Sequence, residues 1–568
     1  MSEFEPRTPE DQLPIEIESA EPGSFSPSTV AAGSAALALA ACGGGGGGTT
    51  PPAPAPPMPP AIVLPTRAQA SKMLGQAAMG ATSAQIEQIA ATGYEAWLDA
   101  QFNTPRQISH WDWLVAGGFA VSANVNNQAG FDPVMWRQLI ASPDQLRQRV
   151  GMALLNFLVV GIDGVNLPWR QFAVAAYVDL LMDGAFGNFR TLLQNISTNV
   201  AMGYYLTFAG NRKANPQSGS VPDENYAREL MQLFTIGLLK LNPDGTVQTS
   251  GGQPIETYTQ EDITGLARVF TGWNIDSADN STPDRMRRPM INNAAAHETG
   301  AKSFLGTNIP AGTNGADSLR LALDAIFANP NVAPFVCKQL IQHLVTSNPP
   351  PAYVARISAV FENNGSGTRG DLRAVVRAIL LDVEARNDAI AGAPTYGKLR
   401  EPINRLTGWA RAFSASSPSG AWAIGNTSST ANRLGQSPGR SPSVFNFFRP
   451  GYTPPNTAIA TSNLVAPEFQ ITNEPSVVAY VNYMQALIVS GAGDFRANYA
   501  DILTKADNSA NLVDEVDILL GAALSAATKT SIRAAVDAIS STAANGPLNR
   551  TYTAILLTLA SPEYLAQK

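Results

Sequence analysis

Charged side chains are scarce in this chain of 568 residues, of which Asp, Glu, Lys and Arg make up 15%. The net charge of -7 at pH 7 leaves no excess of the Lys and Arg that nucleic-acid phosphates require. The tightest cationic cluster, Arg285, Arg287 and Arg288, is typical of a solvated loop, with phosphate binding as the less favoured interpretation. The composition therefore argues against a nucleic-acid partner.

Cysteine and histidine are rarer still, with two and three residues respectively. Two cysteines exclude a disulfide framework, and a zinc site of three histidines would use every histidine in the chain. Cys337 lies in a helical pattern, where a lone thiol usually acts as a small core residue. His343 shares that pattern and is assigned a structural role, whereas His110 stands beside Trp111 in a loop or at a helix start. His297 remains the histidine best placed for chemistry.

Long hydrophobic runs are missing from the later chain, because the most apolar one, residues 153–162, is too short to span a membrane. Residues 30–41 are apolar and end in Leu39-Ala-Ala-Cys42, which resembles a bacterial lipoprotein signal with a lipidated cysteine. Arg7 stands among several acids, unlike the positively charged start of such signals, so residues 1–42 also fit a disordered tail. The small residues before Cys42 and the flexible segment after it favour an exported lipoprotein, periplasmic or in the outer membrane, that contacts the membrane only through its lipid.

Residues 43–65 predict a linker, because a glycine run is followed by a tract rich in Pro and Ala. Residues 66–568 predict a single large, mainly α body, with two subdomains that divide near 310–330, because apolar positions recur three and four residues apart. Residues 416–455 are rich in Ser, Gly, Asn and Pro and predict a long irregular loop. The predicted helices cover residues 67–80, 83–102, 144–160, 170–197, 222–237, 260–271, 317–328, 331–346, 352–363, 370–384, 398–414, 474–491, 528–541 and 548–560.

Two helical segments carry an unusual number of polar side chains beside a full apolar stripe. In residues 222–237, Glu224 lies four positions before Arg228, so the two side chains can pair. In residues 260–271, Thr259 and Asp262 have the spacing of a capping box. Turn signals in residues 241–256 predict a small β-hairpin flap between the two helices, which should pack side by side.

The charged side chains of these helices admit two interpretations. They form either a network of ion pairs that fixes helix packing, or a polar pocket that binds a divalent metal or performs acid-base chemistry. In the second interpretation the catalytic set is Glu229, His297, Arg228 and Arg268, and the metal set is Glu224, Glu229, Asp262 and His297.

The segment 297–306 contributes the histidine of both sets. His297 is followed by Glu298, Gly300 and Lys302, which would suit a proton donor, a metal ligand or an anion clamp. The alternative is a capped turn whose imidazole bonds to the backbone. No nucleophile elbow, Walker loop or dinucleotide fingerprint accompanies it.

The signature segments, together with several further motifs, resemble a large bacterial family known as domain of unknown function 1800. The resemblance runs from residue 67 to the end of the chain and includes the motifs Arg147-Gln-Arg149, Lys398-Leu-Arg-Glu-Pro402, Leu434-Gly-Gln436 and Ser561-Pro-Glu563. The chain departs from the family at residues 153–157, where Ala-Leu-Leu-Asn-Phe stands in place of the Trp-His-x-His-Phe of many relatives. Asn156 therefore occupies the position of a histidine.

The resemblance implies an exported bacterial protein but no settled activity or cofactor. Members are often encoded beside a sulfatase-like family, which implies a protein partner or a shared substrate. Two functions follow as hypotheses: an envelope enzyme, or an accessory to one, with a polar pocket in residues 222–273 and 297–306, and a scaffold or binding protein that partners the sulfatase-like protein.

Overall fold

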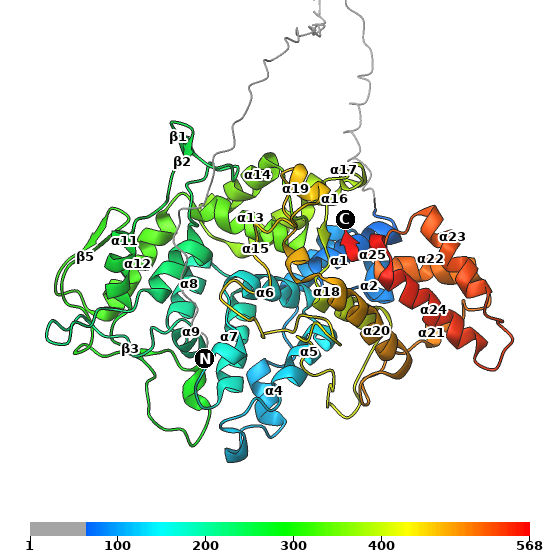
Figure 1. The fold of residues 1–568 in the computed structure, drawn as a ribbon, viewed down its shortest axis with the longest axis horizontal. Helices are drawn as coiled ribbons and strands as arrows, with labels where there is room; N and C mark the ends of the chain where they lie inside the picture. The colour runs from blue at the N-terminus through cyan, green and yellow to red at the C-terminus, as the bar shows by residue number, and fades with distance from the viewer. Residues whose placement is uncertain (1–63) are drawn as a thin grey trace, which may run out of the picture. The chain divides into compact units, whose positions relative to one another are not determined.

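Helices account for most of the computed structural model, which describes residues 64–568 (Figure 1). Cys42, the signal-like segment and residues 43–63 of the expected linker lie outside the described residues. The sheets within residues 64–568 are four antiparallel pairs of short strands. The expected mainly α fold with a small hairpin is therefore confirmed.

The N-terminal helices divide more often than the periodicity predicts. Gly93 adopts φ 86°, a value that favours glycine, and ends one helix before the next begins. Asn188 takes an extended conformation and caps the following helix, so the predicted helix 170–197 becomes two. The helices of this part are α1 (Arg67–Ala77), α2 (Ser83–Thr92), α3 (Tyr94–Asn103), α4 (His110–Ala116), α5 (Phe131–Ala141), α6 (Gln145–Phe157), α7 (Arg170–Gly184), α8 (Phe189–Ser197) and α9 (Val200–Tyr205).

The middle of the chain combines the signature helices with three hairpins. The first signature helix continues from α10 into a π-helical turn, Leu230–Thr235, and the predicted flap is the pair β1–β2. The helices here are α10 (Asn225–Glu229), α11 (Gln260–Ala267), α12 (Gly315–Ala328), α13 (Val332–Leu344), α14 (Pro351–Glu362), α15 (Leu372–Leu381), α16 (Val383–Arg386) and α17 (Asp388–Ala391), with the 3-10 turns η4 (Arg268–Phe270) and η5 (Asp284–Arg287). The strands are β1 (Thr249–Ser250), β2 (Gln253–Pro254), β3 (Trp273–Asn274), β4 (Ile291–Asn292), β5 (Lys302–Phe304) and β6 (Thr307–Ile309).

The C-terminal part begins with a strand rather than the predicted helix at residue 398. Lys398 and Leu399 pair with Gln567 and Ala566, and Pro402 then starts the helix. The expected irregular loop is present, because no helix or strand lies between Ala412 and Ala458. The elements of this part are β7 (Lys398–Leu399), α18 (Pro402–Ala412), α19 (Ala458–Thr461), η6 (Pro467–Ile471), α20 (Glu474–Ser490), α21 (Ala500–Leu503), α22 (Ser509–Leu520), α23 (Ala526–Asp537), α24 (Gly546–Ala560), α25 (Pro562–Leu565) and β8 (Ala566–Gln567).

Elements from the two ends of the described chain lie side by side (Figure 1). Helix α22 packs on α1, and the guanidinium of Arg67 pairs with both carboxylate oxygens of Glu515 at 2.7 and 3.1 Å. The described residues belong to one compact unit, and α12 spans most of the region in which a division into two subdomains is expected. One continuous apolar core runs through this unit, and Cys337 is fully buried in it, as predicted.

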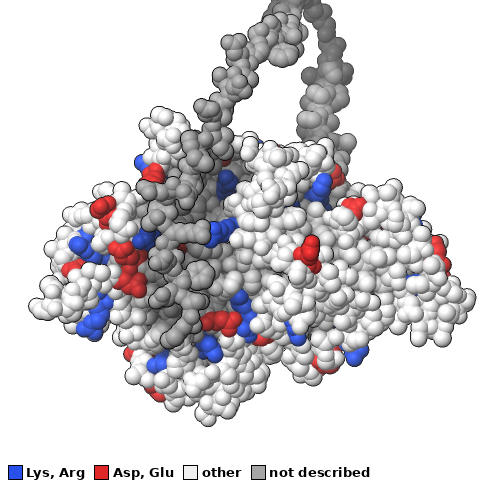
Figure 2. Space-filling model, viewed as in Figure 1, with Lys and Arg blue, Asp and Glu red and all other residues white. Residues whose placement is uncertain are grey.

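Charged side chains are sparse on the described surface that Figure 2 shows. On the face seen in Figure 2, the basic and acidic side chains are interspersed and separated by wide uncharged areas. None of the helices in residues 64–568 is both long enough and apolar enough to cross a membrane.

Candidate functional site

Glu224 joins the two signature helices. Its Oε1 accepts a hydrogen bond from the hydroxyl of Thr264 at 2.7 Å, and its Oε2 accepts one from the amide of Gln260 at 2.7 Å. The predicted pair with Arg228 is also present, at 3.3 Å. Because Gln260 and Thr264 belong to α11, the carboxylate of Glu224 bridges α10 and α11, which pack side by side as the signature pattern predicts.

Asp262 has two structural tasks. Its Oδ2 accepts a hydrogen bond from the backbone N–H of Thr259 at 2.8 Å, which completes the predicted capping box of α11. Its Oδ1 accepts the backbone N–H of Leu305 at 2.6 Å, in the turn between β5 and β6. Leu305 has φ 48°, a strained value for a branched side chain, so Asp262 stabilises both the helix start and this turn.

His297 is buried and bonded on both sides of its ring. Nδ1 donates to the carbonyl of Thr271 at 2.9 Å, and Nε2 accepts from the hydroxyl of Ser318 at 3.3 Å. Burial lowers the pKa of His297. The backbone N–H of Glu298 also bonds to the Thr271 hydroxyl, at 2.8 Å. The arrangement matches the capped-turn alternative, in which the imidazole holds the segment 297–306 against the end of η4 and the start of α12.

Of the remaining two predicted residues, Arg268 has a hydrogen-bond partner, whereas one carboxyl oxygen of Glu229 has none within the described residues. The guanidinium of Arg268 donates to the carbonyl of Ala301 at 3.4 Å and so also contacts the segment 297–306. Glu229 is 7% exposed, and its Oε2 has no hydrogen-bond partner within residues 64–568. Burial raises the pKa of Glu229, and the nearby guanidinium of Arg228 only partly opposes this.

The predicted metal set does not assemble. Within residues 64–568, no group of three or more His, Cys, Asp and Glu side chains lies close enough together to hold a metal ion. Two of the four expected ligands, Asp262 and His297, are occupied by backbone and hydroxyl partners instead. The signature segments therefore meet in space as expected, but their charged groups are built into the packing.

A second polar cluster, which we call the buried ionic centre, was not predicted as a site. It consists of Lys398, Glu401, Glu468, His343 and Asn156, with Arg149 and Gln436 at its edges. Nζ of Lys398 lies 2.9 Å from Oε1 of Glu468 and 3.9 Å from Oε1 of Glu401, and all three side chains are at most 3% exposed. The centre gathers residues from α6, α13, β7, η6 and the long loop.

The hydrogen bonds of the centre converge on Glu401 and on the end of α13. Glu401 accepts from the amide of Gln436 at 2.8 Å and from the amide of Asn156 at 3.2 Å. The same Asn156 amide lies 3.4 Å from Nδ1 of His343. The carbonyl of His343 accepts from Lys398 at 2.9 Å and from Arg149 at 2.8 Å, as suits the negative end of a helix.

The pKa values of the two acids of the centre shift in opposite directions. Burial alone would raise the pKa of Glu401, but Lys398 and Arg149 outweigh it and lower the pKa below its ordinary value. Burial raises the pKa of Glu468 despite the nearby Lys398, and its Oε2 has no partner within the described residues. Burial, with the charge of Lys398, lowers the pKa of His343 to about 3. The imidazole therefore stays neutral beside the lysine.

The sequence contained signals for this centre. Lys398, Glu401 and Gln436 lie in two of the motifs that carry the family resemblance, and Asn156 lies at the departure from it. His343 is structural, as predicted, but fully part of a charged network. What the sequence does not show is that segments more than 200 residues apart, such as Asn156 and Glu401, meet at one point.

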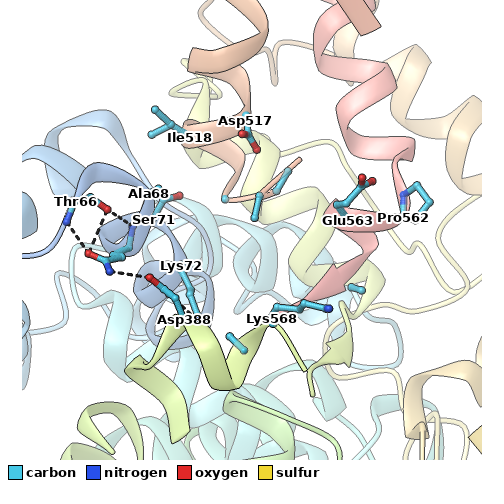
Figure 3. A pocket seen from close by; sticks show the side chains of 17 residues that line it. Thr66, Ala68, Ser71, Lys72, Asp388, Asp517, Ile518, Pro562, Glu563 and Lys568 are labelled. Atoms are coloured by element: carbon cyan, nitrogen blue, oxygen red, sulfur yellow. Dashed lines mark hydrogen bonds and ion pairs between the residues drawn. The ribbon is translucent and has the colours of Figure 1, made fainter. Parts of the chain in front are cut away.

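The hollow between α1, α17, α22 and α25 contains none of these residues (Figure 3). It has a volume of about 620 Å³, and its polar rim includes Lys72, whose ammonium lies 3.3 Å from Asp388. Gln69 bonds to the same carboxylate at 2.8 Å, and Asp517 and Glu563 lie on the far wall in Figure 3. Much of the remaining lining is Ala and Gly, which offer no group for chemistry.

The neutral state of His343 predicts a loss of stability in mild acid. A histidine in the unfolded chain has a pKa of about 6.5, whereas His343 in the folded protein has a pKa of about 3. Between these two pH values His343 binds a proton in the unfolded chain but not in the folded protein. At pH 5 this favours unfolding by roughly 2 kcal/mol. Glutamine does not titrate, so we expect the free energy of unfolding of His343→Gln to fall by about 2 kcal/mol less between pH 7 and pH 5 than that of the unsubstituted protein. Urea denaturation at the two pH values measures this difference. Equal losses in both proteins would contradict this account.

Comparison with known proteins identifies one family. The model of a family described as a protein of unknown function, DUF1800, matches residues 72–566. Searches of curated proteins and of solved structures gave no significant match. The matched range contains the signature segments, the buried ionic centre and nearly all of the described body. The chain therefore belongs to the DUF1800 family.

Proposed function

We propose that this protein is an exported, lipid-anchored scaffold or binding protein of the bacterial envelope, in which the signature residues hold the body together. One observation carries the proposal: Glu224, Asp262 and His297, three of the four residues that the expected metal site would need free, bond to neighbouring elements. The family resemblance adds a sulfatase-like protein as the partner or as a user of the same substrate.

If the signature residues serve as a framework that holds the body together, their substitution should lower the free energy of unfolding. Asp262→Ala removes the cap of α11 and leaves the Leu305 N–H without its acceptor, so we expect the free energy of unfolding to fall by about 2 kcal/mol. His297→Ala should cost about as much, because it removes a buried ring and two hydrogen bonds. Asp507→Ala, which removes an exposed carboxylate, is the control. Chemical denaturation of the full chain measures the difference, and unchanged stability in both signature variants would refute the framework role.

Lipid anchoring predicts a membrane partition that depends on one thiol. In a bacterium that processes lipoproteins, the unsubstituted chain should enter the detergent phase and carry a lipid by mass spectrometry. Cys42→Ser should remain in the aqueous phase, whereas Cys337→Ser should behave as the unsubstituted chain because Cys337 is buried. Identical partition of the two variants would exclude the anchor. Native mass spectrometry of protein taken from its own envelope would also report a partner.

Glu229 supports an enzyme as the second candidate function. Its buried carboxyl group has a raised pKa, and Oε2 has no hydrogen-bond partner within the described residues. The residue lies where the helix changes to a π-helical turn, a geometry that is frequent at functional sites. A carboxyl group with a raised pKa keeps its proton to higher pH than usual, which suits a general acid.

Glu229→Gln separates this candidate from the scaffold. The amide keeps the shape of the side chain, so stability at pH 7 should hold or rise, because a buried carboxylate is removed. An acid catalyst would lose activity by about 100-fold or more, measured as release of soluble carbohydrate or peptide from isolated envelopes. Glu224→Gln, at the half-buried start of the same helix, is the matched control. Equal release by both variants and the unsubstituted chain would contradict catalysis by Glu229.

A further inference from the structure

A polar cleft lies between α4, α7 and α8, and none of the signature residues lines it. It has a volume of about 560 Å³ and is closed on one side by Arg287 of η5. A second hollow of about 400 Å³ shares Arg106, Asp112 and Asp183 with it, so the two adjoin. Both volumes fall within the range of about 300–1,000 Å³ that is common for small-ligand sites.

Asp179 is the buried anchor of the cleft wall. Its Oδ1 accepts from Nδ1 of His110 at 2.8 Å and from Nη1 of Arg106 at 2.8 Å, and its Oδ2 accepts the backbone N–H of Trp111 at 2.9 Å. Burial alone would raise the pKa of Asp179, but His110 and Arg106 outweigh it and lower the pKa below its ordinary value. Asp179 is thus an ionised positioning residue that fixes Arg106 and Trp111 along the cleft.

Two guanidinium groups then shape the open part of the cleft. The second fork nitrogen of Arg106, Nη2, pairs with Asp183 at 2.8 Å, and the Asp183 side chain remains 68% exposed. The guanidinium of Arg287 lies 4.9 Å from the centre of the Trp111 ring. The Arg106–Asp183 ion pair and the Arg287–Trp111 contact hold two planar guanidinium groups and one carboxylate in fixed positions along the cleft.

Acidic side chains outnumber basic ones in the lining of the cleft. Arg106 and Arg287 face Asp112, Asp179 and Asp183, so the cleft has no positive excess for a polyanion. The other polar groups at its edge are hydroxyls and amides, including the exposed side chains of Thr191 and Asn195. Such groups both donate and accept, and they suit a ligand that does the same.

We propose that this cleft binds a neutral oligosaccharide of the cell envelope, with Asp183, Thr191 and Asn195 bonding its hydroxyl groups beside Arg287. Sugar hydroxyls can donate to carboxylates and accept from guanidinium groups, and two adjoining hollows can take successive rings. The inference deepens the proposed function by naming the ligand class, and it depends on that function only for the origin of the glycan.

The test measures binding by titration calorimetry on the full chain with Cys42→Ser, which is free of any lipid. Chitotetraose, cellotetraose and maltotetraose are the probes, and a heparin tetrasaccharide is the polyanionic comparison. We expect at least one neutral probe to bind and the heparin fragment to bind more weakly. Because the anchor is absent, failure of the lipid proposal leaves this result unaffected.

Variants locate the site. Asp183→Asn and Arg287→Gln change exposed side chains and should each weaken binding about tenfold, the loss expected for a hydrogen bond to a charged group. Lys72→Gln, in the hollow of Figure 3, is the matched control and should bind as before. No binding of any neutral probe up to about 10 mM, a preference for heparin, or full affinity in both cleft variants would overturn the proposal.

Discussion

The ammonium group of Lys398 is the point on which the assembly of this body depends. It is 1% exposed, lies between two carboxylates and bonds to the last turn of α13. A buried charge of this kind is stable only while all its partners remain, and loss of one typically costs about 3–5 kcal/mol. Because those partners come from separate parts of the sequence, a single side chain couples α13, α18 and η6 into one unit.

The signature segments use the same physics at smaller scale. Glu224 couples α10 to α11, Asp262 couples α11 to the β5–β6 turn, and His297 couples that region to α12. Each polar group replaces a water contact by a specific partner, so it fixes register where apolar packing alone would allow sliding. A dense polar motif therefore does not by itself mark a reaction centre, although Oε2 of Glu229 has no hydrogen-bond partner within residues 64–568.

The sequence predicted local features far better than convergent ones. Helix periodicity, the capping box of Thr259 and Asp262, the Glu224–Arg228 pair and the hairpin flap depend on residues a few positions apart, and all are present. Division of the long helices at Gly93 and Asn188 escaped prediction because the apolar stripe continues across each break, although a glycine marks the first and an asparagine cap the second. The buried ionic centre and the cleft of Asp179 escaped it because their members lie up to hundreds of residues apart. Motif residues such as Glu401 could be noticed from sequence, but their common neighbours could not.

The pairing of Lys398 and Leu399 with Gln567 and Ala566 sets an order of events. The strand that positions the central lysine pairs with a strand from a distant part of the chain, and α1 likewise packs on the distant helix α22. Contacts at such sequence separation form slowly and late. The charge of Lys398 therefore gains all its partners only when these distant segments have come together in the complete fold.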